Sequence, residues 1–272
     1  MGYEIKPCVH YLGVKIDNVN FARAQGIIDD TIKTGRRGYV CVTDVGNVIG
    51  ASQNARLREA INSSLLSVAD GMPLAWYGRM TGCSEMDRVS GMDLMAGLFA
   101  ADNGYRHFLL GETEERINRV IEKARSITPT IKISGYSPPF KEFDRYDNMR
   151  MMEMLNRERP DIVWISFGGS KQEQWMHNNI GYLDRGIMVG VGAAFKWFVG
   201  DLVTPPRILQ RMGLQWTFRI GQHLIQNPRK NLQFIVKTVL KRKLIFVCHF
   251  PAEVVKARRE LGKEGKMNRQ VS

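Results

Sequence analysis

Residues 161–192 read DIVWISFGGSKQEQWMHNNIGYLDRGIMVGVG, and this stretch decides the fold. Two short apolar runs, Asp161–Phe167 and Ile187–Gly192, flank a segment that begins near Ser170 and is typical of a helix. Short apolar runs that alternate with helical segments predict parallel strands joined by crossover helices. The stretch therefore predicts an α/β fold.

The same alternation extends toward the N-terminus. Four further strands are predicted at Tyr39–Thr43, Leu65–Ala69, His107–Leu110 and Ile131–Gly135. Helices are predicted at Ala51–Ile61, Gly91–Ala101, Glu112–Ser126 and Arg145–Arg157. This pattern indicates a Rossmann-like parallel sheet flanked by helices. We expect residues 1–200 to form this α/β body, with residues 201–272 as an appendage.

Glycines follow several of the predicted strands. Ligands of open α/β sheets bind beyond the carboxyl ends of the strands, where glycine lets the backbone approach a ligand closely. Any one of these glycines could equally just end a strand, but their recurrence favours a nucleotide or phosphate pocket. No GxxxxGK[ST] or GxGxxG motif is present, which argues against P-loop and ordinary dinucleotide sites. The candidate glycines are Gly111, Gly168, Gly190 and Gly192.

The formal net charge of +12 is concentrated at one end of the chain. Residues 201–272 hold 15 Lys/Arg and 4 Asp/Glu, whereas residues 1–200 are nearly neutral. A basic segment of this kind is expected to meet a polyanion: nucleic acid, anionic lipid or a phosphorylated substrate. The apolar fraction of 44% is that of an ordinary globular protein and excludes a disordered, collagenous or coiled-coil chain.

Metal, targeting and membrane-spanning signals are not found. The cysteines, Cys8, Cys41, Cys83 and Cys248, form no CxxC pair and no zinc-type spacing with histidine. The N-terminal residues have no apolar signal-peptide core, so we expect the protein in the cytosol. The run Leu244–Phe250 is far shorter than the ~20 residues that a membrane span needs. Attachment to a membrane surface stays open.

Four motifs in a fixed order support a more specific interpretation. They are VADGMPL at 68–74, RVSGMDL at 88–94, SKQEQW at 170–175 and GVGAAF at 190–195. The ordered set resembles the WecG/TagA/CpsF family of bacterial glycosyltransferases, N-acetylmannosaminyltransferase-like enzymes of cell-envelope polysaccharide synthesis. The resemblance covers about residues 8–235. It implies inverting transfer of a hexose-type sugar from a UDP-sugar to a polyprenyl-diphosphate-linked saccharide, with no metal and no cofactor.

Two residues at strand ends match the proposed catalytic positions of that family. Asp70 matches the acid that would deprotonate the acceptor hydroxyl, which is the base that an inverting transfer requires. The alternative is an Asp that caps the helix starting near Pro73, because proline is common at the first helical position. Thr43 matches a threonine that could hydrogen-bond the sugar or the catalytic carboxylate.

A second group of residues is expected to bind substrate. The 88–94 motif contains Arg88, Gly91 and Asp93, of which Arg88 and Asp93 are expected to contact sugar or one another. Equal alternatives are an Asp93 that only starts a helix and a purely structural Arg–Asp pair. Lys171, Gln172 and Glu173 follow a glycine loop at a helix start and are expected to line the nucleotide pocket, with a solvated helix end as the alternative. Gly190 and Gly192 are expected to admit the nucleotide.

The appendage is expected to supply arginines to the leaving diphosphate. Departing UDP develops negative charge, and the planar guanidinium of arginine binds phosphate oxygens in pairs. The resemblance assigns this role to arginines that complete the site when the appendage meets the membrane, with lipid binding as an alternative of equal weight. The candidates are Arg207, Arg211, Arg219 and Arg229.

The rest of the appendage predicts a basic amphipathic helix. Apolar residues at 232, 235, 236, 239 and 240 form a helical stripe beside Lys237 and residues 241–243. Each Lys or Arg near an anionic leaflet contributes ~1 kcal/mol, so several together could hold the protein there. We therefore expect a peripheral protein at the cytoplasmic face of the plasma membrane. A helix packed on its own body is the alternative.

Four positions depart from the family pattern. Ser170 replaces a proline, Lys196 an aspartate, Gln215 a glutamate, and Gly46 a histidine or another polar residue. Lys196 reverses a charge beside the expected pocket, so a different donor sugar or acceptor is open.

Two alternative functions remain. One is a nucleic-acid-binding Rossmann-like module with a basic arm, although no base-reading motif is present and we expect no nucleic-acid partner. The other is a catalytically inactive scaffold of the same fold. Whether the protein forms a homo-oligomer is open.

Overall fold

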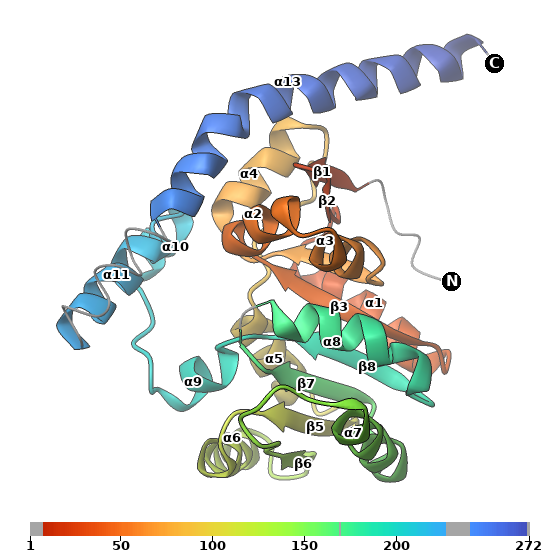
Figure 1. Cartoon of the computed structure of the whole chain (residues 1–272), viewed down its shortest axis with the longest axis vertical. Helices are drawn as coiled ribbons and strands as arrows, with labels where there is room; N and C mark the ends of the chain where they lie inside the picture. Colours follow the sequence, from red (N-terminus) through yellow and green to blue (C-terminus); the bar gives the residue numbers. More distant parts are fainter. Residues whose placement is uncertain (1–7, 169, 227–239, 271–272) are drawn as a thin grey trace.

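The computed structural model describes residues 8–168, 170–226 and 240–270, and confirms the α/β prediction (Figure 1). A six-stranded sheet has the order β4-β3-β8-β7-β5-β6, and every pair in it is parallel. Its strands are β3 (Arg37–Thr43), β4 (Leu66–Ala69), β5 (Arg106–Gly111), β6 (Lys132–Tyr136), β7 (Ile162–Ser166) and β8 (Gly186–Gly190).

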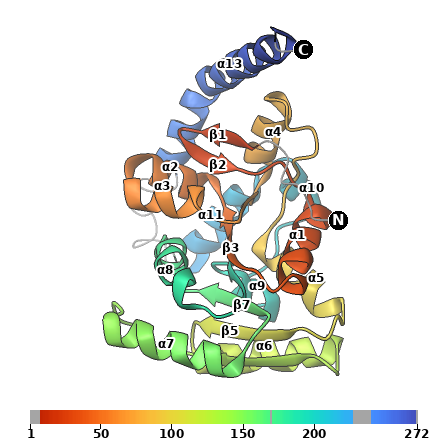
Figure 2. The ribbon, with the colours of Figure 1, turned by 90° about the vertical axis from the view of Figure 1, so that its right-hand side faces the viewer.

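Helices cover both faces of the sheet, as Figure 2 shows. On one face lie α1 (Phe21–Lys33), α5 (Gly91–Ala100), α6 (Glu114–Ile127) and α9 (Ala194–Val199). On the other lie α2 (Val45–Gln53), α3 (Ala55–Asn62), α4 (Met72–Met80), α7 (Arg145–Glu158) and α8 (Lys171–Asn179), which ends in the short helix η1 (Ile180–Tyr182). Successive strand residues serve opposite faces: Phe108 and Leu110 enter one core and Leu109 the other. Burial on both faces explains why these strands are continuously apolar.

Outside the main sheet, β1 (Val9–Tyr11) and β2 (Val14–Ile16) form an antiparallel hairpin. The C-terminal helix α13 (Lys241–Gln270) packs against β1 of this hairpin. The Tyr11 hydroxyl donates to the Phe246 carbonyl oxygen at 2.5 Å, and the two rings stack with centroids 4.6 Å apart. Between body and α13 come α10 (Arg207–Arg211) and α11 (Gln215–Gln226). In Figure 1, α13 runs along the end of the molecule that carries α4 and the hairpin.

The helix predicted at Ala51–Ile61 is wrong in its boundaries. The chain instead forms α2 directly after β3, and then α3. The break is at Asn54, whose extended backbone ends α2 while its side chain accepts the Leu57 N–H and starts α3. Asparagine competes for backbone hydrogen bonds in this way, which an apolar periodicity does not reveal.

Most of the predicted amphipathic stripe lies outside the described residues, which resume at Leu240. In the described parts of the chain, every helix is too short or too polar to cross a bilayer. The division of the chain at residue 200 stays a prediction.

Gly111, at the end of β5, is required by close packing against β7. Its φ is +116°, and a Cβ there would lie 2.3 Å from the Ser166 carbonyl oxygen. A side chain would therefore force the two strands apart exactly where they approach the carboxyl edge of the sheet.

We expect Gly111→Ala to lower the free energy of unfolding by about 3 kcal/mol, since it combines backbone strain with a clash against backbone. Gly181→Ala is the matched control, because a Cβ at Gly181 meets nothing within 4 Å and its backbone needs no positive φ. Urea unfolding of both variants measures the difference. Equal midpoints would contradict the packing argument.

Candidate active site

A cavity of about 270 Å³ opens at the carboxyl ends of β3, β4 and β8. We call it the Asp70 cavity. It collects residues from segments far apart in the sequence, as the end of a parallel sheet does. Its lining includes Asp44, Asn47, Asp70, Arg88, Gly91, Gln172, Gly192, Thr204, Pro205, Gln210 and Gln215. Five of the predicted site residues therefore share one cavity, and the appendage forms part of its wall.

Asp70 lies directly after β4, and its backbone N–H donates to the Thr43 carbonyl oxygen at 2.8 Å. The N-cap of the following helix α4 is Gly71, and no side chain makes a capping hydrogen bond there. The N-cap position of α4 is therefore taken by Gly71 and not by Asp70. Its carboxyl group is half-buried at the cavity wall, where it can meet a ligand.

Arg88 is held at the cavity by an ion pair. Its Nη1 donates to Asp93 Oδ2 at 3.0 Å, and the same carboxylate accepts the Ser90 hydroxyl at 2.6 Å. Ser90 in turn caps α5 by accepting the Asp93 N–H. Asp93 thus positions Arg88 and does not line the cavity. The Arg88 Nε is buried and finds no acceptor among the described residues.

Gln172, the second residue of α8, reaches across to β8. Its Oε1 accepts the Gly192 N–H at 3.1 Å. A Cβ at Gly190 would lie 2.7 Å from the Met176 Cε and 3.1 Å from the Gln172 Nε2. The space beside Gly190 is therefore occupied by the Met176 and Gln172 side chains. Gly190 leaves room for the Gln172 side chain, and the Gly192 N–H holds it in the cavity wall.

Glu173 is fully buried and lines neither this cavity nor the second one described below. Its Oε1 accepts from Asn47 Nδ2 at 3.1 Å and from Gln172 Nε2 at 2.9 Å. Desolvation raises the pKa of this carboxyl to about 7, despite the hydrogen bond from Gln172, and the charge of Asp44 acts in the same direction.

Thr43 is also fully buried, and its hydroxyl pairs with the Ser67 hydroxyl at 2.9 Å. It joins β3 to β4 beneath Asp70 and does not line the cavity.

A second cavity, of about 1310 Å³, lies beyond the ends of β5 and β7, between α7 and α8. We call it the aromatic cavity. Rings of Phe143 and Trp175 each pack edge-on against Phe167, with centroids 5.1 and 5.2 Å apart. The predicted residues Gly111 and Lys171 line it, together with Arg56, Lys141 and Arg145, whereas Gly168 does not. Lys171 and Gln172 are consecutive, so one turn of α8 contributes to both cavities.

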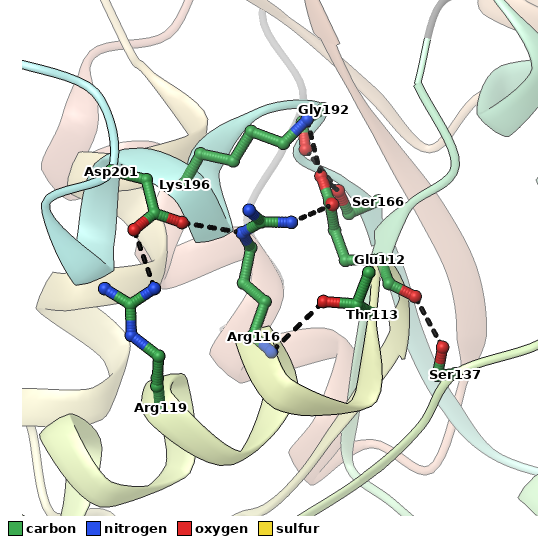
Figure 3. Close-up of polar contacts among 9 residues, drawn as sticks. All are labelled: Glu112, Thr113, Arg116, Arg119, Ser137, Ser166, Gly192, Lys196 and Asp201. Atoms are coloured by element: carbon green, nitrogen blue, oxygen red, sulfur yellow. Dashed lines mark hydrogen bonds and ion pairs between the residues drawn. The ribbon is translucent and has the colours of Figure 1, made fainter.

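Between the cavities, the loops after β5, β7 and β8 are joined by an ionic network around Glu112 (Figure 3). Its carboxylate accepts from Arg116 at 2.8 Å and from Ser166 at 3.3 Å, and lies 3.4 Å from Lys196 Nζ. The charge of Lys196, which departs from the family pattern, is therefore paired. The single hydroxyl hydrogen of Ser166 is shared with the Gly192 carbonyl oxygen, which lies closer, at 2.6 Å.

The network ends at Asp201, the first residue of the appendage. Arg116 Nε and Arg119 Nη1 donate to it at 2.8 and 2.7 Å (Figure 3). Arg116, with Arg119, holds the pKa of Asp201 below its usual value. The start of the appendage is thus tied to α6 and, through Arg116, to Glu112.

The arginines predicted in the appendage are less fully placed. Arg207 begins α10 and Arg219 lies in α11, but their side chains are outside the described part. Arg211 is exposed at the end of α10, and Arg229 falls outside the described residues.

A different arginine, Arg242 of α13, approaches the site. Its Nη1 lies 3.5 Å from the place that a Cβ would take at Gly46, and Asp44 Oδ1 lies 3.0 Å from the same place. The missing side chain at Gly46 leaves room for it.

Asp44 and Asn47 line the cavity but were not among the predicted site residues. Asp44 follows β3 directly and caps α2 by accepting the Asn47 N–H at 2.7 Å. The position of Asp44 directly after β3 could have indicated that it lies at the site. The two strands that flank β3 in the sheet, β4 and β8, are also followed by predicted site residues, Asp70 and Gly192.

Comparison with known proteins agrees with this geometry. A protein of Bacillus subtilis (strain 168), named N-acetylglucosaminyldiphosphoundecaprenol N-acetyl-beta-D-mannosaminyltransferase, is 29% identical over 172 residues, which are 62% of this chain and 64% of that protein. A protein of the same name from Bacillus spizizenii (strain ATCC 23059 / NRRL B-14472 / W23) is 26% identical over 182 residues, which are 66% of this chain and 68% of that protein. This chain thus spans less than two thirds of the length of the B. subtilis relative.

The family model described as the glycosyl transferase WecG/TagA/CpsF family matches residues 9–259, from the hairpin to α13. This confirms the resemblance of the four motifs, and the chain belongs to the WecG/TagA/CpsF family of glycosyl transferases.

Proposed function

We propose that this protein is an inverting, metal-independent glycosyltransferase that moves a hexose-type sugar from a UDP-sugar to a polyprenyl-diphosphate-linked saccharide. The observation that supports it best is the Asp70 cavity, which brings the carboxylate of Asp70 and the guanidinium of Arg88 together at the carboxyl edge of the sheet. The names of the two Bacillus relatives describe transfer of an N-acetylmannosaminyl group to N-acetylglucosaminyldiphosphoundecaprenol.

In the proposed reaction, Asp70 takes the proton of the acceptor hydroxyl. At the same time the oxygen of that hydroxyl attacks the anomeric carbon of the donor sugar from the face opposite UDP. The bond from that carbon to the diphosphate oxygen breaks, and UDP leaves with the electron pair. Arg88 offsets charge at the reacting end of the donor, and its pair with Asp93 keeps the guanidinium in place.

The two cavities suit two parts of the donor. Aromatic rings can stack on a nucleobase, and cationic side chains at the cavity wall can meet the diphosphate. We therefore assign the nucleotide to the aromatic cavity and the sugar to the Asp70 cavity. The Ser166–Gly192 hydrogen bond lies between them, so a donor seated in both would cross this point.

Association with an anionic membrane surface is the second part of the proposal. Exposed apolar side chains gather on α4, on the segment through α10 and on α13, and α13 contacts α4. The helix α13 begins with three basic residues, Lys241, Arg242 and Lys243, next to its exposed apolar side chains. The exposed apolar set comprises Trp76, Met80, Val203, Ile208, Met212, Leu244 and Val247.

We expect Asp70→Asn to lower kcat at least about 100-fold, because the amide cannot accept the hydroxyl proton. Binding of UDP, measured by calorimetry, should stay within about threefold of wild type, since the nucleotide is assigned to the other cavity. Transfer is measured with a panel of UDP-sugars and a lipid-linked acceptor. Asp184→Asn, in an exposed loop before β8, is the control and should behave as wild type. Full activity of Asp70→Asn would remove the base assignment.

We expect the double variant Leu244→Asp/Val247→Asp to lose binding to phosphatidylglycerol vesicles by at least about tenfold, because both side chains are about two-thirds exposed on α13 and become charged. Ile127→Asp, exposed on α6 far from this surface, is the matched control. Vesicle flotation measures binding, and circular dichroism checks folding. A double variant that floats like wild type would refute the assignment of this surface.

A further inference from the structure

Glu173 links two residues of the Asp70 cavity without lining the cavity itself. One of its oxygens, Oε1, accepts from Asn47 Nδ2 in α2 and from Gln172 Nε2 in α8. The helix α2 follows β3 and α8 precedes β8, so the contact between Asn47 and Glu173 joins residues 126 positions apart. A single buried atom thus joins two walls of the cavity.

This contact fixes which polar atoms Asn47 and Gln172 offer to a ligand. A primary amide has one carbonyl acceptor and two N–H donors. In Gln172 the carbonyl is used by Gly192 and one N–H by Glu173, so its orientation is set at both ends. In Asn47 one N–H is used by Glu173, which leaves the carbonyl oxygen for the cavity. Without Glu173 the Asn47 amide could turn over, and Gln172 would be held only by the Gly192 N–H.

We propose that Glu173 is a positioning residue, which holds the amides of Asn47 and Gln172 in the orientation that receives the donor sugar. This inference rests on the proposed transfer reaction and adds a residue that acts through two others.

The carboxyl group is expected to work in its uncharged form. Burial raises its pKa to about 7, and its second oxygen is buried with no hydrogen-bond partner among the described residues. The titratable groups that act on it from neighbouring elements are Asp44, at the start of α2, and Cys41, in β3. Ionisation above pH 7 would place a second negative charge near Asp44, in a site that must accept an anionic donor.

The kinetic test compares Glu173→Gln and Glu173→Leu with wild type. Glutamine keeps the size and a carbonyl acceptor but cannot ionise, so kcat/KM at pH 6 should stay within about threefold of wild type. Leucine removes the acceptor and should lower kcat/KM by at least about 30-fold. Wild-type kcat/KM should fall about fivefold from pH 7 to pH 8, whereas Glu173→Gln should stay flat. Glu122→Gln, exposed on α6, is the control and should keep the wild-type pH profile.

A spectroscopic test separates this inference from the proposed function. The side-chain amide resonances of Asn47 and Gln172, followed by ¹⁵N NMR, should shift between pH 6 and pH 8 in wild type and stay constant in Glu173→Gln. Absence of transfer by wild type across the donor panel would sink the proposed function and leave this readout intact. Amide resonances that ignore pH in wild type, or a Glu173→Gln enzyme that keeps the wild-type pH profile, would overturn the positioning role.

Discussion

All six strands of the main sheet run in one direction, so all their carboxyl ends meet at one edge. The site depends on this constraint more than on any single contact. It brings the end of β3, near Asp44, beside the end of β4, at Asp70, and beside the loop after β8, at Gly192. Residues that are more than 140 positions apart in the sequence then form one cavity, and the helices that start there bring their first residues into it.

The polar groups at this edge are fixed by one another before any ligand arrives. Asp93 and Ser90 hold Arg88, while Glu173 and the Gly192 N–H hold Gln172. Such a site need not reorganise its dipoles during a reaction, which is where electrostatic catalysis gains its advantage. The cost is local: a carboxyl group is buried at Glu173, where desolvation raises its pKa.

The fold could be predicted from the sequence because it follows from local patterns, and the carboxyl edge of the sheet is then the expected place for a candidate site. Apolar runs marked the six strands, and Asp70 could be noticed because it directly follows one of them. The side chains that orient the residues of the candidate site could not be predicted from the sequence. The pairing of Lys196 with Glu112, and the bonds of Glu173 to Asn47, join residues that are distant in the sequence and meet only through the strand order. The break at Asn54 was missed because a single capping hydrogen bond overrides apolar periodicity there.

The appendage, residues 201–272, contributes both to the Asp70 cavity and to the surface proposed to bind lipid. Charge alone admitted nucleic acid as well as lipid, but exposed apolar side chains beside the basic start of α13 favour a lipid surface. The same segment also reaches the site: Thr204, Pro205 and Gln215 line the Asp70 cavity, and Asp201 ties the segment to the network around Glu112. At its other end, α13 is anchored on the body through Tyr11 and Phe246. If the proposed membrane surface holds the appendage, it therefore acts directly on one wall of the Asp70 cavity, because the segment that would meet the lipid is continuous with the segment that lines the site.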